Sequence, residues 1–180
     1  MKKVIVFLAD GSEEIEALTP VDMLRRAGAE VTFAGAGKKE CVCSHGVAIV
    51  TDKTAKECAG ESYDMVVLPG GMPGTLNLGA DEDVKAITEK AFREGKLVAA
   101  ICAAPSLLGA WGMLSGKRAI CYPGFEEKLT GAVIAEEKAV RDGNVITAAG
   151  AGAAMEFALM LVCALYGEEA SEKLRKAVLA

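Results

Sequence analysis

The chain has 180 residues, of which 52% are hydrophobic and 25% are charged, and its net charge is −5. These values predict a soluble globular protein folded as one domain over residues 1–180, and the lack of any basic run longer than a pair disfavours nucleic-acid binding. The first apolar stretch ends at Ala9, too short for a secretion signal or a membrane span, so we expect a cytoplasmic protein whose six cysteines are reduced and which does not enter membranes.

Short apolar runs alternate with segments of helical spacing along the chain. In the first part they predict, in order, a strand at 4–9, a helix at 15–24, a strand at 31–34, a hairpin pairing 47–51 with the segment near Cys41, and a strand at 65–68. In the second part they predict a helix at 83–94, a strand at 97–101, a helix at 105–113, a short strand at 118–121, two strands around the turn at 142–144 of which the second is 145–148, and helices at 153–166 and 171–179. This order predicts an α/β fold with a mainly parallel sheet covered on both faces.

Unusual loops follow four of these strands. An acidic segment occupies residues 10–16, a Pro-Gly-Gly loop begins at 69, Cys102 follows the strand at 97–101, and a glycine-rich loop covers 149–152. Ligands of parallel sheets bind beyond the carboxyl ends of the strands. We therefore expect an acid cluster, a loop of backbone donors and a thiol to meet at one edge.

Cys102 lies where a strand joins a helix that begins with Pro105. The N–H groups and the dipole at a helix start stabilise a thiolate, so this position favours a reactive cysteine of lowered pKa. The alternative is a buried structural thiol, which is common for cysteine.

Glu13, Glu14 and Glu16 are candidates for an acid beside this thiol. First-turn acids are also favoured by the helix dipole alone, which is the better account of at least two of them. A protonated carboxyl would donate a hydrogen bond to the sulfur and then act as general acid or base. Glu16 lies deeper along the helix, but the residues alone leave the three acids open.

Two further patterns have competing interpretations. Gly70 and Gly71 fit an oxyanion hole built from backbone N–H groups, but also an ordinary turn. Cys41, Cys43 and His45 alternate along one strand as a soft-metal site would, but incidental thiols in a hairpin explain them better. Cys121 ends a short strand and is a weaker candidate for a second thiol at the same edge.

Four motifs together resemble the DJ-1/ThiJ/PfpI superfamily, and specifically its DJ-1-like branch. They are VIVFLADGSEEIEALTPVDMLRRAG, DMVVLPGG, AAICAAP and AGAGAAMEFALMLVCALYG, and the resemblance runs from Val4 to Gly167. It implies a flavodoxin-like three-layer α/β/α sandwich and a homodimer, with no cofactor and no resident metal.

The resemblance also assigns residues. It implies that Cys102 is the reactive cysteine, that Glu16 is its partner acid, and that the cysteine oxidises readily to a sulfinate. It implies that the backbone N–H groups of Gly70, Gly71 and Ala103 line the oxyanion side. Arg26, or its neighbour Arg25, matches a position that approaches the site across the dimer.

The implied activity is that of a glutathione-independent glyoxalase (glyoxalase III), which converts methylglyoxal to lactate, or of a deglycase, in defence against oxidative and carbonyl stress. The alternative is a non-enzymatic redox sensor or chaperone. Ala103 stands where protease-type members carry histidine, which argues against proteolysis. Three positions depart from relatives: Tyr122 replaces a histidine, Ala149 lies near a lost positive charge, and His45 replaces an arginine.

Overall fold

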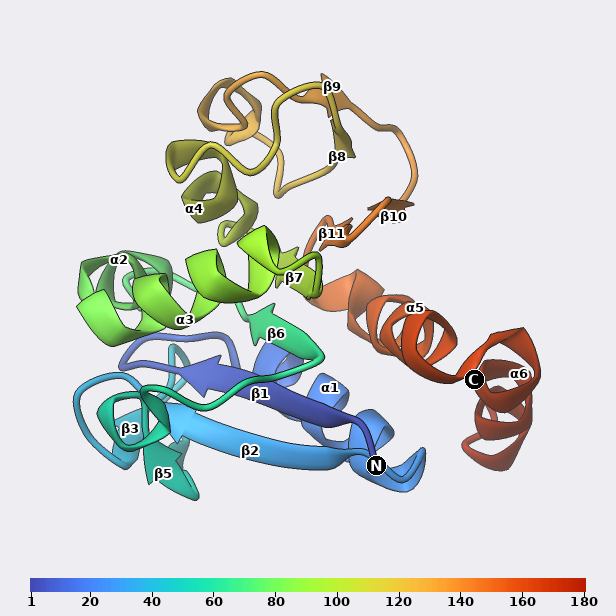
Figure 1. Ribbon diagram of the computed structural model, residues 1–180, viewed down its shortest axis with the longest axis horizontal. Coiled ribbons are helices and arrows are strands. Elements are labelled where there is room, and N and C mark those ends of the chain that lie inside the picture. Colours follow the sequence, from blue (N-terminus) through green and yellow to red (C-terminus); the bar gives the residue numbers. More distant parts are fainter.

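The computed structural model describes all residues from 1 to 180, and a seven-stranded sheet lies at its centre (Figure 1). The strand order is β10-β11-β7-β6-β1-β2-β5. The strands are, in that order, Ala139–Asp142, Val145–Ala148, Leu97–Ile101, Met65–Leu68, Lys3–Leu8, Glu30–Gly35 and Lys53–Thr54. Only β10 runs antiparallel to its neighbour. The predicted mainly parallel sheet is therefore confirmed.

Helices cover both faces of this sheet, which makes three layers (Figure 1). One face carries α1, α5 and α6, which are Glu14–Arg26, Ala154–Tyr166 and Glu168–Ala177. The other face carries α2, α3 and α4, which are Gly74–Ala80, Glu82–Arg93 and Pro105–Ala110. The α/β/α sandwich expected from the family resemblance is confirmed.

Two hydrophobic cores lie on opposite faces of the sheet, and β1 shows why its strands are apolar throughout. Val4, Val6 and Leu8 enter the core beneath α1 and α5, and the alternate residues Ile5 and Phe7 enter the core beneath α3 and α4. All five are fully buried. A strand covered on both faces needs apolar residues at every position, since successive side chains point to opposite sides.

Small elements complete the chain. The hairpin β3–β4 pairs Glu40–Val42 with Ala48–Val50 as predicted, and the parallel pair β8–β9 joins Arg118–Ala119 to Val133–Ile134. Three single turns of 3₁₀ helix lie at Lys56–Cys58, Glu126–Lys128 and Ala151–Ala153. None of the helices is long and apolar enough to cross a membrane.

The elements differ from the sequence prediction in several places, among them the short strands β5 and β9, which were not predicted. Helix α2 was not predicted, because it is short and follows a glycine-rich loop. Helix α4 ends at Ala110 rather than at residue 113, since Gly112 has φ +72° and stops helical geometry. The strand predicted at 118–121 ends at Ala119, because the N–H of Ile120 donates to the hydroxyl of Thr147 at 2.9 Å and not to a strand partner.

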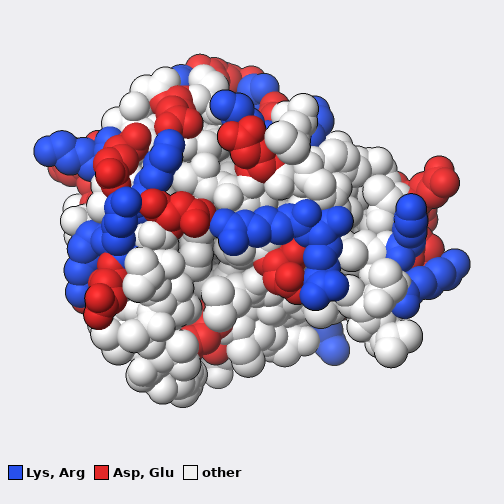
Figure 2. Space-filling view, turned by 90° about the horizontal axis from the view of Figure 1, so that it is seen from below, with Lys and Arg blue, Asp and Glu red and all other residues white.

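Charged side chains of both signs are interspersed over the surface, as the face drawn in Figure 2 shows. Many form ion pairs on the outside of the molecule, such as Arg25 with Asp52 at 2.8 Å. No large patch of one sign is visible on that face. This distribution agrees with the absence of basic runs in the sequence.

Candidate active site

Cys102 follows β7 at the carboxyl edge of the sheet and has a strained backbone. Its φ is +64°, in the left-handed region that costs a non-glycine residue about 1–2 kcal/mol. Two backbone bonds hold it there: its N–H donates to Ala148 at 2.9 Å, and its carbonyl accepts from Tyr122 at 2.8 Å. Strain of this kind persists only where the surroundings enforce it, and it is often found at functional sites.

The structure selects one acid of the three as the partner of Cys102. Glu16 is 1% exposed and accepts the N–H of Gly70 at 2.9 Å. It lies close to Cys102 across Gly70, where an added Cβ would be 2.6 Å from both the Glu16 Oε2 and the Cys102 Cβ. Glu13 instead caps α1 by accepting the N–H of Glu16 at 2.8 Å. Glu14 points to the β3–β4 hairpin, where it accepts the N–H of His45 at 2.7 Å. The three acids therefore have three different roles.

Burial is the main reason that Glu16 is a weak acid. It raises the pKa of this carboxyl to about 7, against the lowering effect of the hydrogen bonds from Cys102 and Gly70. The charge of Glu13 raises it further. Glu14 shows the opposite outcome: burial opposes its ionisation, but hydrogen bonds from His45 and Ser44 lower its pKa to about 2.

The thiol differs from the sequence expectation, which was a lowered pKa. Burial and the charge of the Glu16 carboxylate raise the pKa of Cys102 to about 12. The backbone N–H groups of Gly71 and Ala103 face the sulfur and lower the pKa, but by less. The sequence showed the helix start and the donors, whereas the burial and the facing carboxylate depend on the tertiary structure. Burial and the facing carboxyl therefore both favour the protonated form of the Cys102 thiol.

Gly70 makes room for the pair. A Cβ added at Gly70 would lie 2.6 Å from both the Cβ of Cys102 and the Oε2 of Glu16, closer than real contacts allow. The N–H of Gly70 binds Glu16, so its expected place among the oxyanion donors is corrected to holding the acid. Gly71 has φ +88°, and its N–H and that of Ala103 lower the pKa of Cys102, so both face the sulfur. Their role as oxyanion donors stays a prediction.

Arg26 lies at the other end of α1, roughly 15 Å along the helix from Glu16 at 1.5 Å per residue. Its Nε pairs with Asp22 at 2.9 Å, beside α6, while Arg25 pairs with Asp52. Neither arginine reaches Cys102 of its own chain. A contact across a dimer stays a prediction.

The proposed trio of Cys41, Cys43 and His45 does not form a common site. Both thiols are buried in the core, whereas the His45 side chain is 74% exposed. His45 Nδ1 instead lies 2.9 Å from Glu14 and 3.9 Å from Glu13. This cluster ties the hairpin to the start of α1. Cys121 is buried in the core under α3 and α4, the opposite core from the one Cys102 packs against.

The loop after β1 is held by a residue that the sequence interpretation did not single out. Ser12 is fully buried, and its hydroxyl accepts the N–H of Ala9 at 3.1 Å. Its own N–H returns a bond to the carbonyl of Ala9. This closed turn places Glu13 and Glu16. The signal was the turn-forming segment Asp10-Gly11-Ser12, which was interpreted only for its acid.

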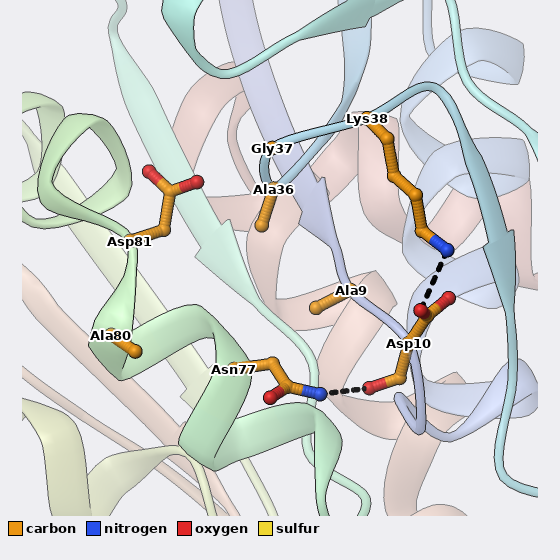
Figure 3. Close-up of a pocket in the computed structure, with 8 residues that line it drawn as sticks. All are labelled: Ala9, Asp10, Ala36, Gly37, Lys38, Asn77, Ala80 and Asp81. Atoms are coloured by element: carbon orange, nitrogen blue, oxygen red, sulfur yellow. Dashed lines mark hydrogen bonds and ion pairs between the residues drawn. The ribbon is translucent and has the colours of Figure 1, made fainter.

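A hollow lies at the carboxyl edge of the sheet, beside the loop that follows β1 (Figure 3). Lys38 pairs with the Asp10 carboxylate at 2.7 Å, and the Asn77 amide donates to the Asp10 carbonyl at 2.8 Å. Asp81 accepts the first N–H groups of α3. Because these polar groups are already partnered within the chain, the hollow supports the loop and we assign no ligand to it.

Known proteins resemble this chain along most of its length. A family model described as the DJ-1/PfpI family matches residues 2–164. The chain is 41% identical over 171 residues to Protein DJ-1 homolog B of Arabidopsis thaliana, covering 93% of this chain and 39% of that protein. It spans less than half the length of the two Arabidopsis relatives it matches.

Two further matches extend along nearly the whole of both chains. The chain is 33% identical over 174 residues to a Caenorhabditis elegans protein named Glutathione-independent glyoxalase DJR-1.2, covering 96% of this chain and 92% of that one. The solved structure titled Toxoplasma gondii DJ-1, oxidized superposes with a TM-score of 0.96 at 36% identity, covering 99% and 98% of the two chains.

Replacing Gly70 tests the close approach of the pair. We expect Gly70→Ala to destabilise the fold by about 1–3 kcal/mol, because the methyl group has no room between Cys102 and Glu16. Gly152→Ala is the matched control on the neighbouring loop, since a Cβ there meets nothing within 4 Å. Urea unfolding measures both. Equal stability of the two variants would contradict the packing described here.

The raised pKa of Glu16 predicts that this residue lowers the free energy of unfolding at high pH. The folded state keeps this proton up to about pH 7 and the unfolded chain only to about 4.5, so stability falls as pH rises between these values. We expect Glu16→Gln to stabilise the protein by about 3 kcal/mol at pH 8 and by little at pH 4. Glu14→Gln has the opposite sign at pH 8, since the Glu14 pKa is lowered. Unfolding free energies at both pH values decide this.

Proposed function

The chain belongs to the DJ-1/PfpI family, and we propose that it is a cysteine-dependent, glutathione-independent glyoxalase (glyoxalase III) or deglycase-type enzyme. Its substrates would be methylglyoxal-like α-oxoaldehydes or their adducts, and its role a defence against carbonyl and oxidative stress. The observation that carries the proposal is the close approach of the buried Glu16 carboxyl to Cys102 at a strained strand–helix joint. The name of the Caenorhabditis elegans relative supports the same reaction.

The first step adds the sulfur to the aldehyde. Glu16, with a pKa of about 7, takes the proton of Cys102 as the carbon–sulfur bond forms, and the aldehyde oxygen receives that proton. The N–H groups of Gly71 and Ala103 stabilise the negative charge that passes from sulfur to oxygen. The product is a hemithioacetal on Cys102. No resting thiolate is required, which suits the raised pKa of this thiol.

The next steps move one proton and add water. The Glu16 carboxylate removes the proton from the former aldehyde carbon, which gives an enediol, and returns it to the neighbouring carbon. The proton of the hemithioacetal hydroxyl passes to the neighbouring oxygen at the same time, so the hemithioacetal becomes a thioester. Water then cleaves the thioester, releasing the 2-hydroxy acid and the free thiol. Methylglyoxal plus water becomes lactate, and no external oxidant or reductant takes part.

Variants of the pair test the reaction. We expect Cys102→Ser to abolish lactate formation from methylglyoxal and Glu16→Gln to lower it by about 100-fold or more. The wild-type kcat/KM rises with pH through an inflection near 7, as Glu16 loses its proton. Cys163→Ser, near the C-terminal end of α5, is the control that keeps turnover. Full activity of either site variant would falsify the mechanism.

The alternative function is a redox sensor or chaperone that acts through oxidation of Cys102. It is favoured by the likeness to an oxidised DJ-1 structure and by the partial exposure of Cys102. Of the other thiols, Cys41, Cys43, Cys58 and Cys121 are buried. The N–H groups of Gly71 and Ala103 would bind the oxygens of a sulfinate as they bind the sulfur.

Mild peroxide separates the alternatives. We expect two oxygen atoms to be added at Cys102 and none at the four buried thiols, as read by peptide mass spectrometry. If this oxidation occurs while the fresh protein shows no turnover of methylglyoxal, the sensor function replaces the enzyme. If Cys102 stays unmodified while a buried thiol oxidises, the sensor is excluded.

We also propose a homodimer in the cytoplasm. Ile15 and Leu18 on α1 are 53% and 40% exposed, and the adjoining hairpin exposes Val42, Val47 and Val50. The hairpin lies against α1 through His45 and Glu14, so these apolar residues form one area for a second copy to cover. Six free thiols suit a reducing compartment.

Light scattering tests the dimer. We expect the wild type to have the mass of two chains and Leu18→Glu to have the mass of one, because a charge cannot be buried there without a partner. Val133→Glu on the distant strand β9 is the control and keeps the dimer. A monomeric wild type would also remove the predicted contribution of Arg26 across the interface.

A further inference from the structure

An open cavity of about 380 Å³ lies beside the Cys102–Glu16 pair. It is lined by Tyr122, Pro123, Lys138 and the small residues at 149–153. Gly150 joins it to the pair: a Cβ added there would lie 3.3 Å from the Tyr122 ring and 3.9 Å from the Glu16 carboxyl. The backbone N–H of Tyr122 donates to the carbonyl of Cys102 at 2.8 Å. A substrate attached to Cys102 therefore has this cavity next to it.

The cavity is larger than methylglyoxal requires. Its volume exceeds that of a molecule of five non-hydrogen atoms, at roughly 30 Å³ of liquid volume for each water-sized group. Methylglyoxal has three carbons and two oxygens. The remaining space has walls of alanine, glycine, proline and one aromatic ring, which suit a carbon chain or ring.

Lys138 is the one charged residue in this lining. Its ammonium group forms no ion pair or hydrogen bond with the chain, unlike Lys38 or Lys53 elsewhere on the surface. The backbone places it at the cavity wall, since its carbonyl accepts the N–H of Ala149 at 2.9 Å. No acidic residue lines the cavity, so Lys138 is the one charged group of its lining, and the Glu16 carboxyl lies beyond Gly150.

We propose that the preferred substrates are α-oxoaldehydes that carry a carboxylate, which Lys138 binds while the connecting carbons pack against Tyr122. This inference rests on the proposed glyoxalase function and names its substrate class. The chemistry at Cys102 is unchanged. The α-oxoaldehyde 4,5-dioxovalerate, for example, gains one water and becomes 2-hydroxyglutarate.

Two pairs of probes separate charge from size. One is 4,5-dioxovalerate with its methyl ester, and the other is 4-carboxyphenylglyoxal with phenylglyoxal. We expect the wild type to favour the anion of at least one pair by about fivefold in kcat/KM, the size typical of an exposed ion pair. The preference shrinks in high salt, which screens exposed charges.

Variants of Lys138 test whether this residue causes the preference for the anionic probes. We expect Lys138→Met to bring the ratio of anion to neutral probe close to one, Lys138→Glu to reverse it, and Lys138→Arg to retain it. Lys56→Met, an exposed lysine away from the cavity, keeps the wild-type ratio. The inference is overturned if the wild type shows no preference in either pair, or if Lys138→Met retains it.

A binding measurement keeps this inference separate from the proposed reaction. The same probes are tested for protecting Cys102 against N-ethylmaleimide, which requires no turnover. If no probe is turned over but the anions protect better and Lys138→Met removes the difference, the cavity assignment stands and the glyoxalase proposal fails. If turnover occurs but neither kcat/KM nor protection favours the anions, the glyoxalase stands and the assignment to Lys138 fails.

Discussion

The close approach of the Glu16 carboxyl to the Cys102 side chain is the interaction on which the site depends. It needs three elements that are far apart in the chain: helix α1 supplies the acid, the end of β7 supplies the sulfur, and the loop after β6 leaves space at Gly70. A single methyl group at Gly70 would separate the two side chains. The absence of a side chain at Gly70 is therefore as necessary to the site as the side chains of Glu16 and Cys102.

This arrangement costs stability in two ways. Cys102 keeps a left-handed backbone that most residues avoid, and Glu16 is almost fully buried where its charged form is poorly solvated. The two hydrophobic cores supply the burial that offsets these costs. The residues of β1 and β7 near the site are buried, and successive side chains enter opposite cores. The same burial brings the Glu16 pKa to the range in which a carboxyl can both accept and return a proton at neutral pH.

The residues around the Cys102–Glu16 pair make separate contacts. Glu13 caps the helix, Glu14 fixes the hairpin through His45, and the donors of Gly71 and Ala103 face the sulfur. Outside this group lies the cavity with Lys138, which touches neither reacting side chain. In the proposed function, the reacting pair and the residue that binds the substrate's carboxylate therefore lie on different parts of the same sheet edge.

The amino-acid sequence by itself determined the layered α/β fold, the parallel sheet and the position of Cys102 between a strand and a helix. These features follow from local periodicity and from the rule that loops after parallel strands meet at one edge. The choice of Glu16 over Glu13 and Glu14 came only from the tertiary structure, since helical rotation sends each acid to a different neighbour. The raised pKa of Cys102, the role of Gly70 and the separation of Cys41 from His45 were decided there too. Each depends on burial and on charges or atoms brought close from distant parts of the chain, which local sequence patterns do not record.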